Sequence, residues 1–96
     1  MAKAIIKVDV RRRNSLLETL QTQHELRRPY GERSFSYCVD NKKRNIGYVI
    51  LEWDSLRSLH RFLELSQAKE MMATWPIEEI LEVLELYDIN EDILAS

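Results

Sequence analysis

Two histidines could act as general acids or bases in this 96-residue sequence, because imidazole titrates near neutral pH. His60 follows Leu56 and Leu59 at helical spacing in an apolar stripe, and His24 continues the inner face expected for an earlier helix. A histidine at the edge of a core, with its ring nitrogens satisfied, is the commoner role for such positions. We therefore consider both as candidate ligand contacts and assign neither a catalytic role.

Four larger side chains could line a site for a small apolar or aromatic molecule. Tyr37 and Tyr48 fall on neighbouring predicted strands, where each phenol could donate a hydrogen bond to a ligand. Met72 and Trp75 could form an adaptable apolar wall. Cross-strand packing and core filling account for the same residues without a ligand. The sequence thus supplies candidate ligand contacts but no reaction.

The sequence contains no motif that demands a metal or a cofactor. Its single cysteine, Cys38, excludes an internal disulfide and any Cys/His zinc cluster. It has no glycine-rich phosphate loop, no GxSxG or HExxH motif and no paired carboxylates that could be placed in one site. Arg11–Arg13 is expected to be a solvated corner that could hold an anion or pair with glutamates. We expect no metal and no cofactor, and whether the protein is an enzyme stays open.

Composition and charge favour one folded domain spanning residues 1–96. Hydrophobic residues make up 45% and charged residues 31%, with only two glycines and two prolines. No signal peptide or membrane span is visible, so we expect a cytoplasmic protein without a membrane partner. The net charge of −2 divides into +6 over residues 1–48 and −8 over residues 49–96. We expect these charges to meet within the fold or across a dimer rather than on nucleic acid.

Hydrophobic periodicity predicts the elements that would position these residues. Strands are expected at 4–10, 34–39 and 46–53, with a hairpin turn at 40–45. A first helix should begin at a capping box formed by Ser15 and Glu18 and end before Pro29. A second helix should begin after Asp54 and Ser55, pause at Ser66 and close at Trp75 before Pro76.

The segment from Ile77 to Asp88 fits both a helix and a strand. Its glutamates favour a helix by propensity, whereas a strand from about Ile80 to Asp88 would complete a split βαβ motif. We choose the strand, and we expect Asn90–Ser96 to be a tail or a short helix. The prediction is an α+β, ferredoxin-like βαββαβ fold with a four-stranded antiparallel sheet and both helices on one face.

The stretch from Gly47 to Leu56, GYVILEWDSL, resembles the third strand and following helix start of the dimeric α/β barrel superfamily. That superfamily includes antibiotic-biosynthesis monooxygenase-like proteins and haem-degrading monooxygenases. The resemblance implies a homodimer with sheets packed face to face, an apolar pocket between sheet and helices, and cofactor-independent monooxygenase or isomerase-like activity. Phe62 and Met72 stand where the haem-degrading branch has its tryptophan and its iron-ligating histidine, so haem degradation is disfavoured.

A non-catalytic interaction module is the alternative, with an RNA-recognition motif as its sharpest version. Arg44, Gly47, Tyr48 and Val49 match the third-strand signature of that motif. Aliphatic residues occupy its other base-stacking positions, including Ile46. Because stacking supplies much of the affinity in such modules, we expect any nucleic-acid binding to be weak and non-specific.

A homodimer is also expected from the residues themselves. The strand at 46–53 and the final strand carry apolar side chains on both faces, so helices on one side would leave an apolar sheet face uncovered. Soluble monomers seldom expose so large an apolar patch. We therefore expect the protein to be its own partner through an isologous interface.

Overall fold

The computed structural model describes residues 1–10 and 15–89 of the chain. The predictions for Arg11–Arg13 and for Asn90–Ser96 lie outside the described residues. In chain order the elements are β1 (Ala2–Asp9), α1 (Leu16–Arg27), the short 3₁₀ helix η1 (Arg28–Tyr30), β2 (Glu32–Val39), β3 (Ile46–Trp53), α2 (Leu56–Glu64), α3 (Ser66–Ala73) and β4 (Glu79–Tyr87).

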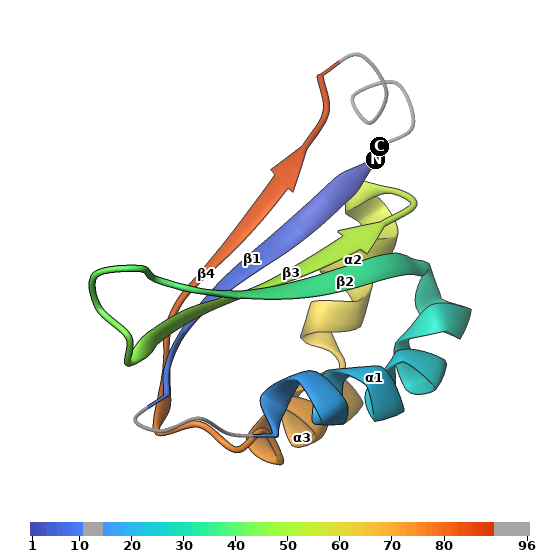
Figure 1. The fold of residues 1–96 in the computed structure, drawn as a ribbon. Helices are drawn as coiled ribbons and strands as arrows, with labels where there is room; N and C mark the ends of the chain where they lie inside the picture. Colours follow the sequence, from blue (N-terminus) through green and yellow to red (C-terminus); the bar gives the residue numbers. More distant parts are fainter. Residues whose placement is uncertain (11–14, 90–96) are drawn as a thin grey trace.

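The strands form one antiparallel sheet in the order β2-β3-β1-β4, and the helices cover one of its faces (Figure 1). This confirms the α+β, ferredoxin-like βαββαβ prediction, including a strand rather than a helix for the ambiguous last segment. No helix in the described part of the chain is long and apolar enough to cross a membrane.

The core lies between this sheet and the helices. Alternate residues of each central strand point into it, as the period-2 pattern requires. The fully or almost fully buried apolar side chains include Ala2, Ala4, Ile6 and Val8 of β1, Val49, Leu51 and Trp53 of β3, Leu16 and Leu20 of α1, and Leu59 and Phe62 of α2. We call this side of the sheet the helix face and the other side the open face.

The observed helix boundaries agree with the predicted ones, whereas one of the two predicted N-caps does not form. Ser55 caps α2 by accepting the Ser58 backbone N–H at 3.2 Å, and an extended Leu65 separates α2 from α3. The predicted capping box at Ser15 is wrong, because the Ser15 side chain makes no capping hydrogen bond. Leu17 follows the buried Leu16 at the start of α1 and is exposed.

The open face has an apolar centre with charged rows on either side. Strand register places Ser36, Ile50, Ile5 and Leu84 in one row across the four strands. The next row towards the β2–β3 hairpin contains Cys38, Tyr48, Lys7 and Glu82, and the next row towards the opposite end contains Ser34, Glu52, Lys3 and Leu86. The face left over is therefore less apolar than predicted, because β1 contributes lysines to it and β2 contributes serines.

β4 is the most exposed element, because it is an edge strand that the helices scarcely cover. All nine of its residues are exposed, and its large apolar side chains are each 37 to 43% accessible: Ile80, Leu81, Val83, Leu84, Leu86 and Tyr87. A register shift opposite Lys7 and Val8 places Leu81 between the two parts of the β1–β4 ladder. An edge strand that is apolar on both sides is a template for association.

Candidate functional site

An open groove lies between the end of α3 and the start of β4. It encloses about 410 Å³, and its lining residues are Lys69, Met72, Ala73, Trp75, Ile77, Glu78, Glu79 and Ile80. Sites for small molecules commonly have volumes of about 300 to 1,000 Å³ and mostly apolar walls. Two of the candidate residues, Met72 and Trp75, thus share one wall of a groove with room for a small molecule.

Contacts from α1 and β1 hold the segment that forms this groove. The Trp75 indole N–H donates to the Gln23 side-chain oxygen at 2.9 Å, and the Gln23 amide nitrogen donates to Thr74 Oγ1 at 2.8 Å. The Glu78 backbone N–H donates to the Asp9 carbonyl at 2.8 Å. Trp75 is only 4% exposed, so its ring forms a fixed wall rather than a mobile cover.

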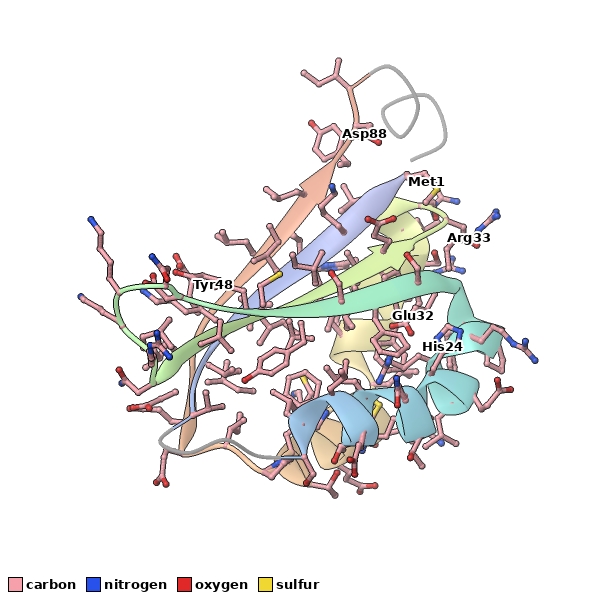
Figure 2. All side chains as sticks on the ribbon, in the orientation of Figure 1. Met1, His24, Glu32, Arg33, Tyr48 and Asp88 are labelled. Carbon is pink, nitrogen blue, oxygen red and sulfur yellow. The ribbon has the colours of Figure 1, made fainter. Side chains whose placement is uncertain are left out.

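A second polar arrangement lies where α1 meets β2. The buried Glu32 carboxylate lies 2.5 Å from His24 Nδ1 through one oxygen and 2.5 Å from Arg27 Nε through the other. Arg27 is fully buried and also donates to the Leu20 carbonyl at 2.9 Å. Figure 2 shows His24 and Glu32 side by side at this end of the sheet. We call these three residues the His24 cluster.

The His24 cluster fixes the orientation of the imidazole ring. The hydrogen bond to the Glu32 carboxyl group holds Nδ1 and turns Nε2 away from this contact. The ring centroid lies 5.4 Å from that of Phe35, and the side chain is 22% exposed. Nε2 has no hydrogen-bond partner among the described residues. No residue of this cluster lines the groove at α3 and β4.

Arg27 and Glu32 were missed as candidates by the sequence reasoning. The signal was present, because Arg27 continues the buried stripe of Leu16, Leu20 and His24 along α1. A cation on a buried stripe needs a buried anion, and Glu32 begins the next strand after the helix break. Arg27 and Glu32 come into contact because the chain turns at η1 between them. The sequence pattern does not predict the geometry of that turn.

His60 lies outside the core, contrary to the expectation of a histidine packed at the core edge. Its side chain is 58% exposed and contacts Glu64 at 3.1 Å and Glu85 of β4 at 3.2 Å. The hydrogen bond to Glu85, and then the negative charges of Glu64 and Glu85, raise the pKa of His60 above its ordinary value of 6.5. His60 therefore connects α2 to the edge strand and lines neither the groove nor the His24 cluster.

Tyr37 and Tyr48 do not line a common pocket, because they lie on opposite faces of the sheet. Tyr37 pairs with Val49 on the helix face, where burial raises the pKa of its phenol above 10.0. Its ring covers Gly47, where an added Cβ would lie 2.7 Å from the ring. Tyr48, labelled in Figure 2, lies on the open face, where it pairs with Lys7 of β1. Tyr48 is the one aromatic side chain among the described strand residues of the open face, so this face offers a single ring for base stacking.

Among the described residues, no group of three histidine, cysteine, aspartate or glutamate side chains has the arrangement of a metal site. Cys38 is exposed on β2.

The fold, but not the sequence, resembles known proteins. No family model and no curated protein matches this sequence. A structure from Bordetella bronchiseptica, described as a "putative antibiotic biosynthesis monooxygenase", superposes with a TM-score of 0.72 at 10% identity, covering 92% of this chain and 96% of that one. Proteins with the same description from Nitrosomonas europaea and Chloroflexus aurantiacus give TM-scores of 0.60 and 0.57 at 14% and 18% identity, and cover 93% and 92% of this chain and 99% and 92% of theirs.

These similarities establish that the chain shares the ferredoxin-like fold of those proteins over most of its length. A common fold hosts many activities, so function has to be argued from the groove, the His24 cluster and the exposed faces of this chain.

Proposed function

We propose that this protein is a homodimer that binds a small apolar or aromatic molecule in the groove between α3 and β4. The groove itself carries this proposal, because it combines about 410 Å³ of space with an indole ring, a methionine and two isoleucines in its lining. Lys69 at one side and Glu78 and Glu79 at the other could bind polar substituents of the ligand.

The homodimer is supported by the apolar side chains that a single chain leaves in water. Ile5, Ile50 and Leu84 form the centre of the open face, and β4 adds further apolar side chains at the edge. A specific interface buries about 800 Å² on each partner. A second copy seated on the open face would cover this centre and leave the charged rows at the rim, which is the usual anatomy of an interface.

A narrower proposal is that the bound molecule undergoes cofactor-independent oxygenation or an isomerase-like reaction. The similar solved structures described as monooxygenases motivate it. Against it, the oriented imidazole of His24 lies outside the groove lining, so no proton acceptor of that kind faces the proposed ligand. The geometry of this chain therefore supports ligand binding more directly than catalysis.

A fluorescence titration tests the binding proposal. Trp53→Phe would leave Trp75 as the only tryptophan. The change removes a buried indole N–H that has no hydrogen-bond partner but leaves a cavity in the core, so the thermal midpoint of this variant is measured before the titration. The aromatic probe 8-anilinonaphthalene-1-sulfonate, whose rings are apolar and whose sulfonate is charged, should quench Trp75 saturably. Ala73→Phe fills the groove and should weaken this binding roughly tenfold.

The matched control is Gln21→Phe, which adds the same ring on the exposed side of α1, away from the groove lining. It should leave the titration unchanged. Quenching that is not saturable, or that responds equally to Ala73→Phe and Gln21→Phe, would contradict the groove as the binding site.

A further inference from the structure

A basic hollow of about 490 Å³ lies at the hairpin end of the open face. Its lining residues are Lys7 of β1, Asp40, Lys42, Lys43 and Asn45 of the hairpin, and Ile46 and Tyr48 of β3. No carboxylate of the described residues forms an ion pair with any of the three lysines. Three ammonium groups therefore share this hollow with one carboxylate.

That carboxylate, Asp40, has a structural role in the hairpin. It accepts the backbone N–H groups of Lys42 and Lys43 at 2.7 and 2.9 Å. These hydrogen bonds, that of Lys43 first, lower the pKa of Asp40 below its ordinary value. Asp40 thus holds the turn from which two of the lysines project, and the hollow keeps an excess of positive charge.

Two glutamates on the open face form the complementary acidic patch. In the β1–β4 ladder, Glu82 is the strand neighbour of Lys7, and Glu79 is the strand neighbour of Asp9 at the end of β1. Because Asp9 also pairs with Ile46 at the start of β3, the acidic patch and the basic hollow lie at the same end of the sheet. This is the end at which β3 and β4 begin (Figure 1). They lie towards opposite edges, since the strand order is β2-β3-β1-β4.

We infer that the basic hollow of one copy binds the Glu79 and Glu82 patch of a second copy, across a two-fold axis that runs parallel to the strands. This inference rests on the homodimer proposed above. Rotation by 180° about such an axis exchanges the two edges of a sheet and preserves its ends. The start of β4 in one copy then lies over the hairpin of the other, and the contact occurs twice.

The alternative two-fold axis lies in the sheet plane but perpendicular to the strands. It exchanges the ends of the sheet and places the opposite end, with Lys3 and Glu52, over the hairpin. Only the parallel axis brings the lysine-rich corner onto the glutamate-rich corner. The same asymmetry runs through the whole sequence, which carries +6 in its first half and −8 in its second.

In this arrangement the apolar row through Ile5 supplies the attraction and the charges select the register. Charged pairs at an interface rim contribute mainly to association rate and specificity, whereas opposed like charges weaken a complex strongly. The charged contacts should therefore determine which of two face-to-face arrangements forms.

A charge-exchange experiment tests this inference by sedimentation equilibrium. One variant carries Lys42→Glu and Lys43→Glu, and the other carries Glu79→Lys and Glu82→Lys. Each variant alone opposes like charges at both contacts, so its dimer dissociation constant should rise roughly tenfold or more. An equimolar mixture restores opposite charges at both contacts, so the dimer containing one of each variant should form preferentially.

The control for the Lys42→Glu and Lys43→Glu variant carries Arg28→Glu and Arg61→Glu, which make the same change in net charge as that variant on exposed helical positions. It should dimerise like the wild type. If both charge-exchanged variants dimerise like the wild type and mix statistically, the docking inference is overturned while the homodimer stands. If the wild type is itself a monomer, the homodimer and the docking both fail.

Discussion

At the scale of single residues, the exposed His60 predicts a pH dependence of stability. Its folded pKa is raised by Glu85 and Glu64, so the protonated ring stabilises the fold fully below about pH 6.5. This contribution is lost as the pH rises through the raised folded pKa. Urea denaturation between pH 6 and 8.5 should show a small fall in unfolding free energy that is absent in His60→Gln. An equal slope in both proteins would rule out His60 as its source.

Gly47 predicts a coupling with Tyr37. A Cβ at residue 47 would lie 2.7 Å from the Tyr37 ring, so Gly47→Ala must displace that ring. Overpacking of this kind costs about 1 to 3 kcal/mol. In a Tyr37→Ala background the same change should be neutral or stabilise by about 0.5 to 1 kcal/mol, because alanine restricts the unfolded chain more than glycine. Additive free energies in the double-mutant cycle would contradict this contact.

The two tyrosines also show what residue patterns cannot determine. Alternation correctly placed Tyr37 and Tyr48 on neighbouring strands, but the face of each depends on the register between β2 and β3. In that register Tyr37 pairs with Val49 and Tyr48 pairs with Cys38, which puts the two rings on opposite faces. Met72 and Trp75 line the same groove because both lie within one short segment, where helical spacing and the following proline restrict the geometry.

At the scale of elements, the buried Arg27–Glu32 pair joins α1 to β2. Both side chains are fully buried, so removing one partner leaves an unpaired charge in the core. Such a loss typically destabilises by about 3 to 5 kcal/mol. We expect Glu32→Leu or Arg27→Met alone to have this effect, and the double variant to recover much of it.

Urea denaturation of the wild type, both single variants and the double variant measures this coupling. The expected double variant is more stable than either single variant, because no unpaired charge remains. His24→Asn serves as the control, since it removes the more exposed contact of Glu32 and leaves the buried pair intact. A double variant as unstable as the sum of the single variants would show that the two side chains act independently.

The last strand shows why elements were easier to predict than their burial. A strand at 80–88 was predicted from topology alone, because three strands would leave the split βαβ motif incomplete. The structure has this strand, β4, at Glu79–Tyr87. Its apolar side chains suggested two buried faces, yet all of them are exposed in the single chain. The proposed second copy would cover them, and the pattern of one strand does not distinguish burial in the core from burial against a partner.

At the scale of the whole molecule, helices cover one face of the sheet and leave the other face uncovered. The helix face is closed by three helices, whereas the open face carries an apolar row between charged rows. The proposed ligand groove lies at the border of the helix layer and β4, and it shares Glu79 with the acidic patch of the open face. Ala73→Phe changes the groove without changing the open face, so it separates ligand binding from self-association in experiments.

Sedimentation equilibrium at micromolar concentration tests the homodimer most directly. The chain has a mass of 11.4 kDa, and we expect the wild type to sediment with twice that mass. Ile50→Lys places a charge in the centre of the open face and should raise the dissociation constant roughly thirtyfold or more, as the loss of a hot spot does, while leaving the helix-face core intact. A wild type that sediments as a monomer, or an Ile50→Lys variant that remains as dimeric as the wild type, would contradict association through this face.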